Sequence, residues 1–198
     1  MKKISLYEGE YDLINRDTAL SLLKDHLNDK RYEHCLRVES TAIDLAKHYD
    51  ADWQKAGIAG LLHDLMKQED DEEMRDVIIS ENLDLDMLTF GNSIWHGPIA
   101  ATYVQKYLGI DDDEILRAIK FHTTGSNDMS LIEKIVYVAD YIEPARDFEE
   151  AKTTRELAYE DIDKAVGYQT RQELIYLVDN RVEIYPNTIF TYNKYSIK

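Results

Sequence analysis

Apolar residues recur at intervals of three and four along most of the chain, which is the spacing that buries one face of a helix. Runs that alternate apolar and polar residues, as half-buried strands do, are scarce. Only three prolines and eight glycines interrupt the pattern. The pattern therefore predicts an all-α fold, and a length of 198 residues fits one domain with its own core.

Helix boundaries are predicted from capping residues and helix breakers. Asp52 is a good N-cap, Ser130 and Glu133 form a capping box, and Pro98 suits the first position of a helix. The expected helices cover about residues 17–27, 31–49, 53–66, 98–108, 111–122, 131–143, 149–159 and 161–184. The acidic run at 69–73 is a solvated loop or a helix start, and the tail from Pro186 is expected to be extended.

Four histidines and two aspartates fall at inward positions or at helix ends: His34, His63, Asp64, His96, His122 and Asp140. Imidazole and carboxylate groups are common metal ligands, and six of them suffice for two ions. A single histidine is more often an ordinary core or surface residue, and His26 and His48, which have charged neighbours, are assigned to the surface. Asp140 follows the apolar run 135–139, where an ionised carboxylate is costly unless it is paired or binds a metal.

Composition excludes several classes of protein. One cysteine allows no intrachain disulfide and no thiolate metal cluster, which favours the cytoplasm. The chain has neither an apolar secretion signal after Met1 nor a stretch that spans a membrane. A net charge of −16 disfavours nucleic acid and anionic lipid as partners. A small polyphosphate can still bind where cations reverse the potential inside a cleft.

Five motifs occur in order along the chain: Arg31-Tyr32-Glu33-His34, residues 62–67 (LHDLMK), His96-Gly97-Pro98, residues 122–125 (HTTG) and residues 140–146 (DYIEPAR). Through them the chain resembles the HD-domain metal-dependent phosphohydrolases, and among these the YqeK-type symmetrical bis(5'-nucleosyl)-tetraphosphatases. The resemblance extends from about residue 17 to residue 188. It implies a single HD domain over residues 1–198 with its core in that range.

The resemblance also implies a chemistry and a set of ligands. The family hydrolyses diadenosine tetraphosphate to two ADP at a di-iron centre, and its members are homodimers. By similarity, Asp64 bridges the two ions, with His34, His63 and Asp140 on one ion and His96 and His122 on the other. Two such ions can share a hydroxide that attacks phosphorus, so no protein nucleophile is required. Manganese and cobalt suit the same ligands as iron.

Further residues match positions that contact substrate in the family. Lys67 shares a helical face with Asp64 and is expected to act in catalysis by neutralising phosphate charge; its alternative is a surface lysine. The residues expected to bind substrate are Arg31, Lys67, His96, Thr123, Arg146, Tyr185 and Thr188. A surface ion pair is the alternative for Arg146, and terminal packing is the alternative for residues 183–188. Tyr185 stands where the family pattern has histidine, which puts base recognition in question.

Two other functions stay open at this point. One is an HD phosphohydrolase that acts on another nucleotide, such as a deoxynucleotide or a cyclic dinucleotide, because two metal ions allow all of these. The other is a regulator that binds a nucleotide without turnover. All six ligand positions are filled, which favours an enzyme over a regulator. A purely structural metal site does not need nearby Lys67, Arg31 and Arg146.

Overall fold

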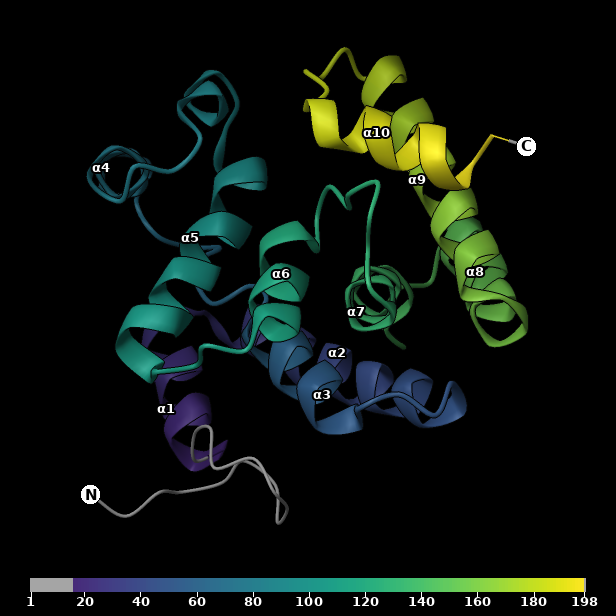
Figure 1. The fold of residues 1–198 in the computed structure, drawn as a ribbon, viewed down its shortest axis with the longest axis horizontal. Helices are drawn as coiled ribbons and strands as arrows, with labels where there is room; N and C mark the ends of the chain where they lie inside the picture. Colours follow the sequence, from purple (N-terminus) through teal and green to yellow (C-terminus); the bar gives the residue numbers. More distant parts are fainter. Residues whose placement is uncertain (1–15, 198) are drawn as a thin grey trace.

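The computed structural model describes residues 16–197, and this part of the chain is helical throughout, with no strand (Figure 1). The elements are α1 (Arg16–His26), α2 (Asp29–His48), α3 (Trp53–Leu62), α4 (Asp71–Ser80), the 3₁₀ helix η1 (Leu85–Thr89), α5 (Asn92–Leu108), α6 (Asp113–Phe121), α7 (Leu131–Ile142), α8 (Glu149–Glu160), α9 (Ile162–Asp179) and α10 (Pro186–Tyr195). The all-α prediction is confirmed. The expectations for residues 1–15 lie outside the described residues.

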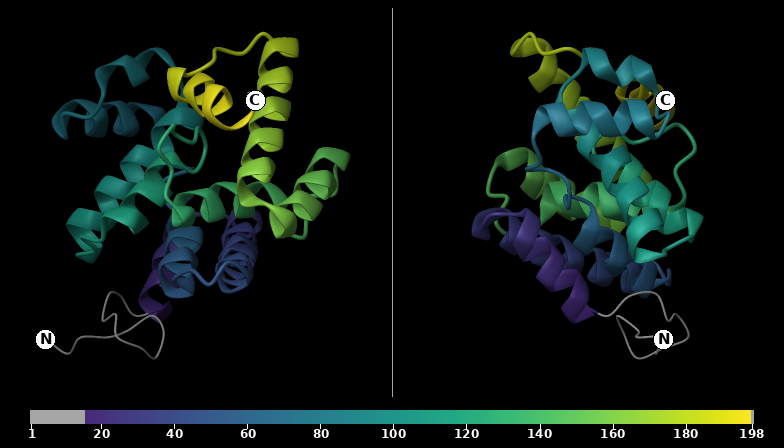
Figure 2. Two further views of the ribbon diagram at one scale, coloured as in Figure 1. Left: turned by 45° about the vertical axis from the view of Figure 1, so that its right-hand side comes forward. Right: turned by 90° about the vertical axis from the view of Figure 1, so that its left-hand side faces the viewer.

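Four helices form the centre of the fold. Helix α2 packs against α3 and α7, and α6 packs against both α3 and α7. Helices α4 and α5 extend from α6 on one side, while α8, α9 and α10 follow α7 on the other; Figure 1 shows α7 end-on between these two groups. Helix α10 packs against the long helix α9, and the left view of Figure 2 shows it beside that helix. None of the described helices is both long and apolar enough to cross a membrane.

Local capping sets several helix starts as the sequence predicts. The Asp52 carboxylate accepts hydrogen bonds from the backbone N–H groups of Gln54 and Lys55, which α3 leaves unpaired. Ser130 and Glu133 form the predicted capping box of α7. Asp70 caps α4, so the acidic run at 69–73 is a helix start.

Two predicted helices are too long. Helix α3 ends at Leu62 instead of Met66, because the chain tightens into turns in which the Lys67 N–H donates to the Asp64 carbonyl at 2.9 Å. Helix α9 ends at Asp179 instead of 184, because Arg181 adopts a φ of 56°, in the left-handed region. The end of α3 matters for function, because it places residues 63–67 on a turn at the centre of the fold.

The predictions at Pro98 and Pro186 are wrong. Helix α5 begins at Asn92, so Pro98 lies inside it; the preceding turn is anchored by buried Trp95, whose indole N–H donates to the Met87 carbonyl at 2.6 Å. Pro186 opens α10 rather than an extended tail. In both cases tertiary contacts determine where the helix begins. Because α5 begins at Asn92, His96 lies within a helix instead of at its entrance.

A partly buried polar cluster joins α7 to α9. The Tyr137 hydroxyl donates to Glu173 Oε2 at 2.7 Å, and the Gln169 amide donates to Glu173 Oε1 at 3.0 Å. Burial raises the pKa of Glu173 to about 7, against the hydrogen bonds from Tyr137 and Gln169 that lower it. The folded protein therefore holds a proton on Glu173 that the unfolded chain releases at lower pH.

We expect Glu173→Gln to stabilise the protein at alkaline pH. A carboxyl whose pKa is raised on folding costs stability progressively as pH rises from its unfolded value towards 7, and the full cost applies above 7. The variant removes that cost. Its free energy of unfolding should therefore equal that of wild type at pH 4.5 and exceed it by about 1–3 kcal/mol at pH 8. Urea unfolding at both pH values measures it. Asp179→Asn, exposed at the end of the same helix, is the control, and an equal gain there would contradict the prediction.

Candidate metal centre

Six side chains with metal-binding groups converge in the middle of the fold. His34 lies on α2, His63 and Asp64 on the turn after α3, His96 on α5, His122 just after α6 and Asp140 on α7. All except Asp140 are buried, and 24% of the Asp140 side chain is exposed. Three groups of three among them have ligand atoms within 4.8 Å of one another. The structure thus brings together residues that are up to 106 positions apart in the sequence.

The Asp64 carboxylate lies between two pairs of imidazoles. Its Oδ2 is 3.3 Å from His63 Nε2 and 3.7 Å from His34 Nε2. Its Oδ1 is 3.2 Å from His96 Nε2 and 3.6 Å from His122 Nε2. On the first side, Asp140 Oδ1 adds a second carboxylate, 3.0 Å from His34 Nε2. This arrangement offers a ligand set on each side of Asp64.

Every imidazole of the centre turns the same nitrogen inward. Each Nδ1 faces an oxygen acceptor: Glu143 Oε1 for His34 (3.2 Å), and the backbone carbonyls of Gly60 for His63 (2.7 Å), Asn92 for His96 (2.7 Å) and Ile119 for His122 (2.7 Å). Carbonyl and carboxylate oxygens only accept hydrogen bonds, so each Nδ1 carries the proton. The four Nε2 lone pairs therefore point towards Asp64 and Asp140.

Such a set of lone pairs fits a cation. The Nε2 atoms of His34 and His63 are buried without a hydrogen-bond partner in the described structure. Those of His96 and His122 are only 2.9 Å apart. Facing lone pairs repel each other unless a proton or a metal ion lies between them, and a buried polar atom without a partner costs about 1–3 kcal/mol. The donors are all imidazole nitrogen and carboxylate oxygen, which suit divalent transition metals.

Without a metal ion, the surroundings of the centre favour the carboxylate form of both aspartates and the neutral form of His96. Burial acts to raise the pKa of Asp64, but the neighbouring imidazoles, His63 first, outweigh it and hold that pKa well below its usual value. The pKa of Asp140 is also lowered, by His34 and His63 against burial. Burial lowers the pKa of His96 to about 4, so this imidazole is neutral at pH 7.

Gly97 lets α5 approach the end of α6. A Cβ atom at this position would lie 2.8 Å from the Lys120 carbonyl and 3.1 Å from the Ile119 carbonyl. The missing side chain therefore permits the contact that brings His96 and His122 together. This gives a physical reason for glycine directly after His96 in the third motif.

The predicted cations border the candidate metal ligands. Arg31 Nη1 donates to Asp64 Oδ2 at 2.7 Å, and Arg146 Nη2 donates to Asp140 Oδ1 at 3.2 Å. Lys67 Nζ lies 3.3 Å from His96 Nδ1; burial lowers the pKa of Lys67, although the charge of Asp64 opposes this. Three positive charges thus surround an otherwise acidic centre.

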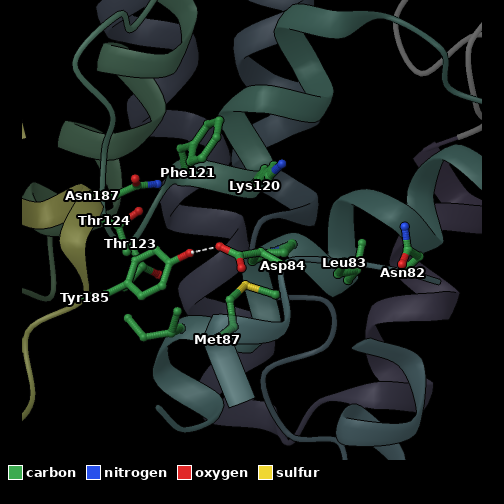
Figure 3. Close-up of a pocket in the computed structure, with 12 residues that line it drawn as sticks. Asn82, Leu83, Asp84, Met87, Lys120, Phe121, Thr123, Thr124, Tyr185 and Asn187 are labelled. Carbon is green, nitrogen blue, oxygen red and sulfur yellow. Dashed lines mark hydrogen bonds between the residues drawn. The ribbon is translucent and has the colours of Figure 1, made fainter. Parts of the chain in front are cut away.

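A cleft of about 350 Å³ adjoins the centre at Thr123 (Figure 3). The Thr123 hydroxyl is 3.1 Å from His122 Nε2 and also lines the cleft. Tyr185, at the start of α10, donates to Asp84 Oδ2 at 2.9 Å across the cleft, and burial and Asp84 raise its pKa to about 12. Thr188 is buried in the first turn of α10.

Glu143, which lies in the fifth motif, is buried and contacts both His34 and Arg37, yet neither Glu143 nor Arg37 was among the residues predicted for the site. The sequence carried a signal for Glu143, because it is a charged residue at the end of an apolar helix, as Asp140 is a charged residue within one. His26, which was assigned to the surface, is partly exposed, and its Nδ1 lies 2.5 Å from Glu69 Oε1. The surface assignment of His48 is confirmed by its exposure.

Comparisons with known proteins identify the family of the chain. The HD domain family matches residues 31–145. The symmetrical bis(5'-nucleosyl)-tetraphosphatases of Halalkalibacterium halodurans and Bacillus subtilis are 44% and 39% identical to the chain, and each match covers 91% of this chain and 97% of the relative. A crystal structure of a predicted HD superfamily hydrolase involved in NAD metabolism from Clostridium acetobutylicum has a TM-score of 0.87 at 37% identity, covering 94% of this chain and 97% of the other.

Proposed function

Because this chain belongs to the HD domain family, we propose that it is a symmetrical bis(5'-nucleosyl)-tetraphosphatase that hydrolyses diadenosine tetraphosphate to two ADP. The reaction adds one water across the central phosphoanhydride bond, so that each ADP keeps two phosphates. The observation that supports hydrolysis is the convergence of four Nε2 lone pairs on Asp64 and Asp140. The likeness to the curated tetraphosphatases along almost their whole length supports the substrate.

The proposed metal ligands are the six residues of the centre. His34, His63 and Asp140 would hold one ion, His96 and His122 the other, and Asp64 both. We propose iron, with manganese and cobalt as alternatives that suit the same ligands. Such a pair, when bound, supplies Lewis-acid polarisation of phosphoryl oxygens and lowers the pKa of water.

In this proposal, positively charged side chains of the protein bind the tetraphosphate. Arg31, Lys67 and Arg146 lie at the edge of the centre and would offset the phosphate charge that the protein's net charge of −16 repels. Lys67 is the catalytic cation of the proposal, because it is half-buried beside His96. Held in place by these groups, the phosphate chain loses little further freedom when it reacts.

The cleft beside Thr123 is the proposed site of one nucleoside. Tyr185 offers an aromatic face and lies on the wall opposite Asp84. The volume of this cleft, about 350 Å³, is in the range typical of sites for small molecules. Thr188 and Thr123 complete the proposed substrate contacts. A homodimer and a cytoplasmic location stay predictions from the resemblance and the composition.

Product analysis tests the proposed reaction. The protein is incubated with diadenosine tetraphosphate in ferrous, manganous or cobaltous buffer, and the nucleotides are separated by chromatography. We expect ADP as the sole product and no product after chelation. AMP with ATP would refute symmetrical cleavage. No product from protein that contains two metal ions would refute this substrate and favour another nucleotide or a non-catalytic regulator.

A further inference from the structure

His34 is held differently from the other three imidazoles of the centre. His63, His96 and His122 each donate Nδ1–H to a backbone carbonyl three or four positions earlier in the sequence. These bonds form locally whenever the helix or turn forms. His34 instead contacts the carboxylate of Glu143, which is 109 positions away in the sequence. Its orientation therefore depends on a side chain from another helix.

Glu143 is itself fixed from several directions. It is 2% exposed, its Oε2 accepts from Arg37 Nε at 2.6 Å and from the Ala145 N–H at 2.7 Å, and its Oε1 faces His34 Nδ1 at 3.2 Å. The backbone that carries it is fixed by Arg155, whose guanidinium donates to the carbonyls of Ile142, Glu143 and Arg146. These contacts hold the Glu143 carboxylate in place independently of its contact with His34.

The position of Glu143 links two ligands of the centre. It caps the C-terminal end of α7, three residues after Asp140, and reaches across to α2, where His34 and Arg37 lie. His34 Nε2 then lies 3.0 Å from Asp140 Oδ1. A rotation of the His34 ring would remove its Nε2 from both carboxylates of the centre.

We propose that Glu143 is a positioning residue for the metal centre, which holds His34 in the Nδ1-protonated tautomer with its Nε2 lone pair directed at the metal. A carboxylate that accepts from the outer nitrogen of a ligand imidazole fixes the ring and increases the basicity of the inner nitrogen. The proposal rests on the proposed metal site but not on any nucleotide substrate. The competing explanation is that Glu143 only joins α2 to α7 through its ion pair with Arg37.

Two measurements on the full chain separate these explanations. The first is the affinity of metal-stripped protein for Mn²⁺, by calorimetric titration. The second is the tautomer of His34, from ¹⁵N–¹H correlation spectra of the metal-stripped protein. We expect Glu143→Gln to weaken Mn²⁺ binding about 10- to 100-fold, as for other outer partners of ligand histidines. In wild type we expect the proton of His34 on Nδ1.

Matched variants control for loss of packing. Glu39 lies on the same helix as His34, is 4% exposed and also accepts two hydrogen bonds from an arginine, Arg16. Glu39→Gln should lower the melting temperature and leave Mn²⁺ affinity unchanged. Arg37→Gln removes the ion pair but keeps the contact between Glu143 and His34, so it should bind Mn²⁺ more tightly than Glu143→Gln.

Three outcomes would overturn the proposal. One is wild-type Mn²⁺ affinity in Glu143→Gln, and another is an equal loss of affinity in Arg37→Gln. The third is a wild-type spectrum with the His34 proton on Nε2, which decides the matter even if Glu143→Gln does not fold. None of these depends on which nucleotide the protein hydrolyses, so a failed product assay leaves the test intact.

Discussion

Replacing Asp64 with alanine is expected to abolish metal binding and hydrolysis together. Each oxygen of this carboxylate faces one pair of imidazoles, so its loss removes a ligand from both sides of the centre. Metal catalysis supplies several kcal/mol of transition-state stabilisation, and about 1.36 kcal/mol is a tenfold change in rate, so hydrolysis should fall by at least about 10³-fold. Elemental analysis and steady-state kinetics on the same preparation measure both losses.

His48→Ala is the control for that variant. His48 is exposed, and its Nε2 contacts the Tyr159 carbonyl at 3.0 Å, away from the centre. It should keep both metal content and turnover. Full turnover in Asp64→Ala would show that the proposed site with two ions is wrong.

Lys67→Met is expected to slow hydrolysis while the metal content stays near that of wild type. Lys67 Nζ lies 3.3 Å from His96 Nδ1 but is not itself a ligand, so the variant removes a positive charge beside the phosphates and leaves the six donors in place. Loss of one group that stabilises developing charge costs about 10²- to 10³-fold in kcat. Methionine keeps the apolar part of the side chain, so thermal stability should change little.

The kinetic pattern distinguishes a catalytic lysine from a surface lysine. If Lys67 acts mainly on the transition state, kcat and kcat/KM fall together. Lys152→Met, which removes an exposed lysine paired with Glu149 on α8, should leave both parameters unchanged. Unchanged kinetics in Lys67→Met would show that this lysine only packs beside the centre and would refute its role in the proposal.

Helix boundaries could be predicted from the sequence where neighbouring residues determine them. Asp52 and Ser130 bond to backbone groups two or three positions away, so their effect is visible in the sequence. Helix α10 could not be predicted in this way. The Thr191 hydroxyl donates to the Thr124 carbonyl, 67 positions away, and only the folded chain brings these two segments together. The start of α5 was missed for the same reason, because buried Trp95 depends on packing against η1.

The candidate ligands were predictable because each is a polar or charged residue at a position where the sequence pattern predicts burial. A charged Asp140 after a run of apolar residues, and histidines at inward positions, are costly unless they pair or bind a metal. Their partners were less visible. Arg31 contacts Asp64 across 33 positions and Glu143 contacts His34 across 109, and no periodic pattern indicates such pairs. The sequence thus indicates which residues are unusual, whereas the fold determines their neighbours.

The convergence of lone pairs also links folding to the supply of metal. The candidate ligands lie on α2, α5 and α7 and on the segments after α3 and α6, and they meet only in the native chain, so the unfolded chain offers no comparable site. By mass action, an ion present at 100 times its dissociation constant would stabilise the native state by about 2.7 kcal/mol. An ion bound by both His96 and His122 would also relieve the repulsion between their facing nitrogens, which lie 2.9 Å apart in the protein alone. The protein's resistance to unfolding would then depend on the free metal concentration around it.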